Sequence, residues 1–128
     1  MKRFKFSLEK VLKLRKSHEQ EAKNELGKAI SALNAIDNAM KQNALLRNQS
    51  IQERFAGINS VMDMLAWDSY IKRLEQESER LTQEAAQAEL IVEEKRNLYI
   101  EASRELKVME NLKEKRKQEY RKEMRNEE

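Results

Sequence analysis

Apolar residues recur along almost the whole chain at alternating steps of four and three. The first stripe contains Leu8, Leu12, Arg15, Glu19, Ala22, Leu26, Ala29, Leu33, Ile36 and Met40. The second contains Ile71, Leu74, Ser78, Leu81, Ala85, Ala88, Val92, Lys95, Tyr99, Ala102, Leu106 and Met109. This spacing keeps one narrow seam of a helix facing a partner helix, as in a coiled coil. We therefore predict an all-α protein made of two long helices.

The two stripes are mirror images of each other along the sequence. Leu12 matches Leu106 and Ile36 matches Leu81, so that the two residue numbers sum to 118 and 117. A constant sum is what an antiparallel pairing of two segments requires. The chain is predicted to be one long antiparallel two-helix coiled coil, an α-hairpin that folds back on itself as a rod.

The turn of this hairpin is predicted near residues 56–60. Gly57 is a good helix stop, because glycine adopts the left-handed conformation without steric cost. Ser60 and Asp63 have the spacing of a capping box that opens the next helix. We expect a small apolar cluster beside the turn, made of Ile51, Phe55, Ile58, Met62 and Leu65.

These signals place the first helix at about residues 5–56 and the second at about 60–116. Residues 117–128 have no partner in this pairing and few apolar anchors, and an isolated helix of that length is marginal in water. We predict a frayed helical tail there. The whole chain, residues 1–128, is predicted to form a single hairpin domain.

Composition agrees with a thin seam rather than a globular core. The 128 residues include no proline, two glycines and no cysteine, with 38% charged and 5% aromatic residues. No apolar run is long enough to cross a membrane, and the absence of cysteine fits a reducing compartment. We expect a cytoplasmic protein without a transmembrane span.

Charge is distributed unevenly around a formal net charge of +3. Residues 1–16 contain seven Lys or Arg against one Glu, and residues 107–125 contain eight against four acidic residues. Residues 68–94 instead contain eight acidic residues against three basic ones. Because the hairpin brings the first two segments together, we expect a basic tip at the two termini and an acidic shaft beyond it.

Several polar residues occupy stripe positions: Arg15, Glu19, Asn43, Ser78, Lys95 and Lys113. Such residues fix the register of a coiled coil at a cost in stability, and long basic stems can reach out to solvent. Glu19 is expected close to Lys95 and could pair with it. A role as proton-relay or ligand groups is the less favoured reading.

The sequence lacks the groups that catalysis needs. His18 is the single histidine, and no glycine-rich phosphate loop is present. Glu75, Glu77 and Glu79 have the spacing of a solvated helix face rather than of a metal site. We predict no catalytic, cofactor-binding or metal-binding residues, and no enzyme activity.

Nucleic acid and a membrane surface are two further candidate partners. The basic tip could attract nucleic acid, but its Lys and Arg residues alternate with Glu and few aromatic residues are available for stacking. Phe4 and Phe6 beside Lys2, Arg3 and Lys5 could form a short membrane anchor, or could instead pack against Leu112 or Tyr120. A protein partner is favoured over both.

Several segments together resemble one protein family. They are FKFSLEKVLKLR at residues 4–15, Leu26-Gly27, Tyr70-Ile71-x-x-Leu74-Glu75, and Leu106-Lys107-x-Met109-Glu110-x-Leu112-x-x-Lys115-Arg116. The chain resembles the FliJ-type proteins of the bacterial flagellar export apparatus, and the likeness spans nearly its whole length. These proteins are antiparallel two-helix coiled coils, similar to the central stalk of rotary ATPases and to equivalent proteins of virulence type III secretion.

The resemblance implies three kinds of partner. The end that carries both termini would enter the hexamer of the flagellar export ATPase, the turn-proximal surface would contact the cytoplasmic domain of the export gate, and the protein would recycle export chaperones. Carried over to this sequence, the ring contact comprises Lys2, Arg3, Phe4, Lys13, Lys16, Lys113 and Arg116. The gate contact comprises Leu46, Trp67, Tyr70, Leu74, Glu77 and Leu81.

The leading hypothesis is therefore a non-catalytic stalk peripherally associated with the membrane-bound export apparatus. One alternative is a cytoplasmic export chaperone or adaptor that does not enter the ring. The other is a coiled coil associated with nucleic acid.

Overall fold

The computed structural model describes residues 3–56 and 60–127. It contains two α-helices, α1 at Glu9–Ala56 and α2 at Val61–Glu127, and no strand among the described residues. They divide into two compact units. The terminal unit comprises Met1–Lys28 and Glu93–Glu128, and the central unit comprises Ala29–Val92.

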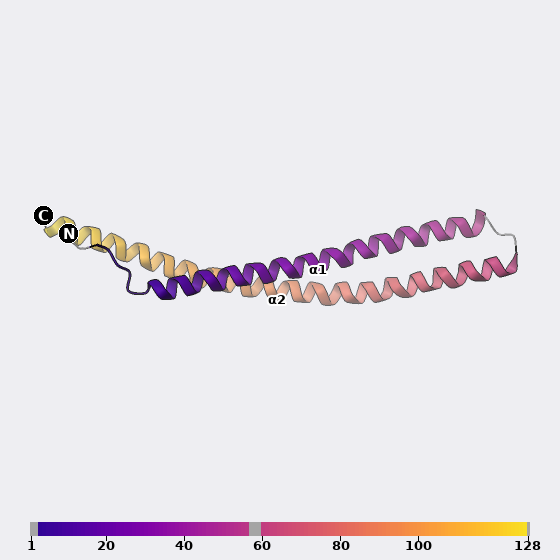
Figure 1. Cartoon of the computed structure of the whole chain (residues 1–128), viewed down its shortest axis with the longest axis horizontal. Coiled ribbons are helices and arrows are strands. Elements are labelled where there is room, and N and C mark those ends of the chain that lie inside the picture. Colours follow the sequence, from indigo (N-terminus) through magenta and orange to yellow (C-terminus); the bar gives the residue numbers. More distant parts are fainter. Residues whose placement is uncertain (1–2, 57–59, 128) are drawn as a thin grey trace. The chain divides into compact units, whose positions relative to one another are not determined.

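Within each unit, a stretch of α1 lies beside a stretch of α2 that runs in the opposite direction (Figure 1). This confirms the predicted all-α antiparallel hairpin. The predicted turn lies between the end of α1 at Ala56 and the start of α2 at Val61. Its middle residues, 57–59, including the predicted stop at Gly57 and the predicted cluster residue Ile58, are outside the described part of the chain.

Large apolar side chains fill the seam of the terminal unit. Leu12 is 1% exposed and is the most deeply buried large side chain of the described residues, and Phe6 and Ala102 are buried as well. Two ion pairs join the helices of this unit: Glu9 pairs with Lys113 at 3.0 Å, and Arg15 pairs with Glu105 at 2.9 Å. Cross-helix ion pairs therefore flank a buried apolar centre.

The first helix begins later than predicted. α1 starts at Glu9, where the Leu12 N–H donates to the Leu8 carbonyl at 2.9 Å, and residues 3–6 have no regular structure. The reason is the spacing of Phe4 and Phe6. Two residues apart on a helix would point in nearly opposite directions, whereas the irregular segment buries Phe6 and rests Phe4 against Tyr120 of α2 with ring centroids 5.5 Å apart.

Residues 3–8 also pack beside α2 further toward its C-terminus than the sequence pairing predicted. Non-helical backbone advances up to about 3.3 Å per residue, against about 1.5 Å in a helix. Residues 3–8 therefore reach as far along α2 as Tyr120. α2 continues as a helix to Glu127, and fraying of residues 117–128 in solution stays a prediction.

Side-chain pairing is displaced slightly from the predicted register. The residue numbers of Arg15 and Glu105 sum to 120, and those of Arg54 and Asp68 in the central unit sum to 122. Both sums exceed the expected 117 or 118. A larger sum is expected from helix geometry, because each side chain leans toward the N-terminus of its own helix. In an antiparallel pair, two side chains therefore meet when each belongs to a residue about one position later in the sequence than the residue at the same height.

The seam of the central unit is built mainly from small residues. Its buried residues are Ala29, Asn43, Ser50, Leu81, Ala85, Ala88 and Val92. The Ser50 hydroxyl donates to the Leu46 carbonyl at 2.7 Å, which satisfies it within α1. Only Leu81 and Val92 add large apolar volume to this buried set.

The start of α2 carries the predicted serine cap. The Asp63 N–H donates to the Ser60 side-chain oxygen at 3.2 Å, and the Met64 N–H donates to the Ser60 carbonyl at 3.2 Å. The serine therefore satisfies an early amide of the helix, as its position in the capping box requires.

The predicted apolar cluster beside the turn is not buried among the described residues. Phe55, Met62 and Leu65 are 71%, 76% and 58% exposed, and Ile51 is also exposed. The reason is their angular position, because these side chains lie away from the seam that holds Ser50 and Leu81. They form an exposed surface instead.

Candidate interaction surfaces

The terminal unit carries the predicted ring contact. Arg3, Lys13, Lys16 and Arg116 are exposed, while Phe4 and Lys113 are partly buried. Lys2, the remaining predicted residue of this set, is outside the described residues. All the described members thus belong to one compact unit, as the sequence predicts.

These residues differ in how free their charges are. Lys113 is held by Glu9, whereas Arg3, Lys13, Lys16 and Arg116 form no ion pair within the described part of the chain. Phe4 is anchored on Tyr120, so the backbone beside Arg3 is held against α2. The surface therefore offers several exposed cations on a packed support, which suits recognition of an acidic protein surface.

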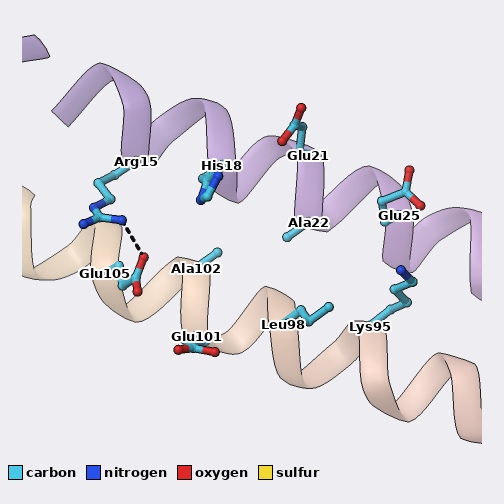
Figure 2. Close-up of a pocket in the computed structure, with 10 residues that line it drawn as sticks. All are labelled: Arg15, His18, Glu21, Ala22, Glu25, Lys95, Leu98, Glu101, Ala102 and Glu105. Atoms are coloured by element: carbon cyan, nitrogen blue, oxygen red, sulfur yellow. Dashed lines mark hydrogen bonds and ion pairs between the residues drawn. The ribbon is translucent and has the colours of Figure 1, made fainter. Parts of the chain in front are cut away.

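An open groove of about 500 Å³ lies along another part of the terminal unit. Its lining comprises Arg15, His18, Glu21, Ala22, Glu25, Lys95, Leu98, Glu101, Ala102 and Glu105. Figure 2 shows Ala22 on α1 and Leu98 on α2 along the groove, and the Arg15–Glu105 pair at one end of it. The groove exists because two alanines on facing helices leave space that larger seam residues would fill.

The groove does not bring together a reactive set of groups. Figure 2 shows Glu21 pointing away from α2 and Glu101 pointing away from α1, so these carboxylates diverge. The expected pair between Glu19 and Lys95 is not formed among the described residues. The ion pair beside this groove joins Arg15 to Glu105 instead. No group of three or more potential metal-ligating residues occurs in residues 3–56 and 60–127.

The central unit carries the predicted gate contact. Leu46 is exposed, Trp67, Tyr70, Leu74 and Glu77 are partly exposed, and Leu81 is 5% exposed. Leu81 therefore lies in the seam and supports the surface from beneath. Trp67, Tyr70, Leu74 and Glu77 follow one another at steps of three and four, so they share one face of α2.

The aromatic part of this surface is ordered by its neighbours. The rings of Trp67 and Tyr70 meet edge to face with centroids 6.2 Å apart, and the Arg73 guanidinium lies 5.8 Å from the Tyr70 ring. A hollow of about 260 Å³ lies between these rings, Asp63 and Ala66. An aromatic pair beside a shallow hollow is a common form of protein-binding surface.

Glu77 is tied to its own helix. The Arg80 Nε–H donates to the Glu77 carboxylate at 2.9 Å, and Arg80 also pairs with Glu84. The hydrogen bond from Arg80 lowers the pKa of Glu77 below its ordinary value, because it stabilises the charged carboxylate. The same pairing raises the pKa of Arg80.

Sequence reasoning missed the pair between Arg54 and Asp68 and the large exposed residues near the ends of the two helices. Arg54 donates through Nη2 to Asp68 at 3.4 Å and joins α1 to α2. Leu45, Val61 and Met64 are exposed although they are large and apolar. The sequence could have indicated their exposure, since each is an apolar residue at a position outside the two stripes.

Two long antiparallel helices, with exposed cations on one unit and an aromatic pair on the other, define a two-helix coiled-coil protein. No helix among the described residues is long and apolar enough to cross a membrane. The family of the flagellar FliJ protein matches residues 4–128, nearly the whole chain, and the chain therefore belongs to the FliJ family. This confirms the resemblance seen in the sequence and assigns the protein to flagellar protein export. Comparison with curated proteins and with solved structures gives no significant match.

Proposed function

We propose that this protein is a non-catalytic stalk that couples the flagellar export ATPase to the export gate. In this proposal the terminal unit binds the ATPase hexamer, and the central unit binds the cytoplasmic domain of the gate. The protein is then held peripherally at the export apparatus on the cytoplasmic side of the membrane. Membership of the FliJ family and the presence of two chemically distinct surfaces support this function.

The exposed cations of the terminal unit are the observation that supports the proposed contact with the ATPase ring. Lys13 and Lys16 project from the first two turns of α1, and Arg116 projects from α2. Because they have no acidic partner within the described residues, they can pair with carboxylates of another protein without first breaking an internal ion pair.

The ring contact is tested by the ATPase activity and hexamer formation of the purified export ATPase with and without this chain. We expect the wild type to stimulate both, and the variant Lys13→Glu, Lys16→Glu to lose most of that stimulation. Lys41→Glu, which reverses a charge in the central unit, is the matched control. Unchanged stimulation by the double variant would overturn the ring contact.

The gate contact is supported by the aromatic pair of the central unit. Trp67 and Tyr70 are both partly exposed, and Leu74 continues their face by one helical turn. Partly buried aromatic residues beside exposed apolar ones provide the central anchors that protein interfaces usually contain.

A paired substitution tests this second surface. Tyr70→Ala with Leu74→Ala should abolish binding to the purified cytoplasmic domain of the gate while circular dichroism shows unchanged helicity. The same variant should still stimulate the ATPase. Retained gate binding would exclude this surface as the contact.

An adaptor that carries export chaperones without entering the ring is the second candidate. The exposed apolar residues near the helix ends of the central unit favour it, since they could hold a partner without any ATPase. Stoichiometry separates the two functions. A central stalk binds once per ATPase hexamer, whereas an adaptor binds up to once per subunit, and the mass of the purified complex gives the answer.

A further inference from the structure

The last part of α2 extends beyond α1 within the terminal unit. Glu9, the first residue of α1, pairs with Lys113 of α2 at 3.0 Å, so α1 has no residues left to face residues 114–127. A helical segment of this length without a neighbour is only marginally stable in water. The helical order of residues 114–127 therefore needs another source of packing.

Burial along this part of α2 indicates that another segment covers it. Lys113, Lys117, Tyr120 and Met124 are partly buried, whereas all the residues between them are exposed. The four follow one another at steps of four, three and four, which places them along one side of the helix. The line of burial that begins in the seam thus continues past the start of α1.

The described segment that packs on this side is residues 3–8, which we call the strap. Figure 1 shows the strap running from the start of α1 beside the end of α2, and the rings of Phe4 and Tyr120 have centroids 5.5 Å apart. Its even-numbered residues are wholly or partly buried, and its odd-numbered residues are exposed. Such alternation is typical of an extended chain with one face against a neighbouring surface.

The strap is anchored where it leaves α1. Phe6 is 8% exposed, and its carbonyl accepts a hydrogen bond from the Glu9 N–H at 3.2 Å. Extended backbone advances about twice as far per residue as a helix does. Residues 4–8 are therefore long enough to bridge the roughly 10 Å of α2 that separate Lys113 from Tyr120.

We propose that the strap keeps the end of α2 helical, and that Phe4 does so through its contact with Tyr120. The contact lies beyond the last pairing between α1 and α2, so it opposes the fraying that the sequence pairing alone predicts. With the strap docked, the end of α2 is a packed helix. With the strap released, it is an unsupported helix end.

Helical order decides how the charges at the end of α2 are arranged. Three basic residues and three glutamates each follow at steps of four, so on a helix they form two rows on opposite faces: Lys117, Arg121 and Arg125 against Glu119, Glu123 and Glu127. An uncoiled chain has no such faces. The strap therefore controls whether the end of α2 presents a separate row of cations.

Backbone hydrogen exchange of residues 117–124 in the purified full chain measures this order. Phe4→Ala should make these amides exchange at least about fivefold faster, because an aromatic contact and its apolar burial are lost. Phe4→Tyr keeps the ring and should restore slow exchange. Phe55→Ala is the matched control, since it removes a 71% exposed ring in the central unit and should leave the exchange unchanged.

A second variant tests the route through Tyr120. In a chain that carries Tyr120→Ala, the further change Phe4→Ala should have little effect on the exchange of residues 117–124, because the contact is already absent. An equal effect of Phe4→Ala with and without Tyr120 would overturn the proposal.

Two other results would also contradict the strap's role. One is unchanged exchange of residues 117–124 in Phe4→Ala. The other is an equal acceleration in residues 13–28 of α1, which would mean that Phe4 stabilises the whole terminal unit rather than the end of α2. Since no export protein is present, these outcomes are independent of the proposed ring and gate contacts.

Discussion

The terminal and central units use the same antiparallel helix pairing but differ in what fills the seam. In the terminal unit, two of the three buried residues are large, Phe6 and Leu12. In the central unit, five of the seven buried residues are Ala, Ser or Asn, and the largest apolar residues near the helix ends are exposed. The comparison teaches that one unit uses its apolar residues mainly for packing, while the other leaves many of them available for binding.

Replacing Leu12 should break this contrast most strongly. Leu12→Ala deletes the most deeply buried large side chain and is expected to lower the free energy of unfolding by about 3 kcal/mol, through lost burial and the cavity left behind. Urea denaturation followed by circular dichroism measures the change. Leu14→Ala, at a 58% exposed position two residues away, should change it by less than about 0.5 kcal/mol. Equal effects of the two substitutions would mean that the seam is placed wrongly.

Replacing Asn43 by a large apolar residue should make the seam of the central unit more apolar, like that of the terminal unit. Asn43 is 7% exposed in the seam and forms no side-chain hydrogen bond among the described residues. Asn43→Leu is expected to raise the free energy of unfolding by about 1 kcal/mol, since an apolar group replaces a polar one in a buried position. Asn48→Leu, at an exposed position of the same helix, is the control. A lower denaturation midpoint for Asn43→Leu would contradict the description of this seam.

Replacing Gly27 in the terminal unit should give a smaller increase in the free energy of unfolding. Apart from its two chain neighbours and the nearby backbone of its own helix, no atom lies within 4 Å of the position that an added Cβ would take, so alanine fits there without displacement. Gly27→Ala is expected to raise the free energy of unfolding by about 0.5–1 kcal/mol, because glycine loses more backbone entropy than alanine in a helix interior. Thermal unfolding measures this. A destabilised variant would show that this position is more crowded than the structure indicates.

The smallest expected effect concerns the ion pair between Glu77 and Arg80 in the central unit. Arg80→Ala should return the pKa of Glu77 upward toward its ordinary value of 4.5, because the hydrogen bond that favours the charged form is removed. A pKa lowered in the folded state stabilises the fold above the ordinary pKa, and this contribution is lost as the pH falls through the lowered value. An NMR titration of the Glu77 side chain in both proteins measures the shift. An unchanged pKa would mean that Arg80 does not hold Glu77 in solution.

Much of the fold could be predicted from the sequence because its rules are local. The alternating steps of four and three identify the seam, and Ser60 marks the start of α2 through a hydrogen bond to a residue three positions on. The start of α1 could not be predicted this way. It depends on the packing of Phe4 against Tyr120, a contact between residues more than one hundred positions apart.

The two candidate interaction surfaces could be predicted only in part, because spacing along the sequence indicates which residues are exposed but not how their side chains pair. Stripe positions tell which residues face the partner helix, so exposed cations such as Lys13 and Lys16 follow from their places outside the stripe. The same cadence also placed Phe55 and Leu65 in a cluster, although both side chains lie away from the seam and are exposed. Pairings such as Arg73 with Tyr70 depend on rotamers, which residue spacing does not specify.

Native-state hydrogen exchange of backbone amides tests the difference between the two units most directly. Local opening is expected to cost more free energy where large side chains fill the seam. Amides of residues 13–28 in α1 should therefore exchange more slowly than those of residues 43–56, and residues 95–113 of α2 more slowly than residues 64–78. Equal or reversed protection would contradict the conclusion that seam composition separates a packed terminal unit from a central unit whose apolar residues remain available for binding.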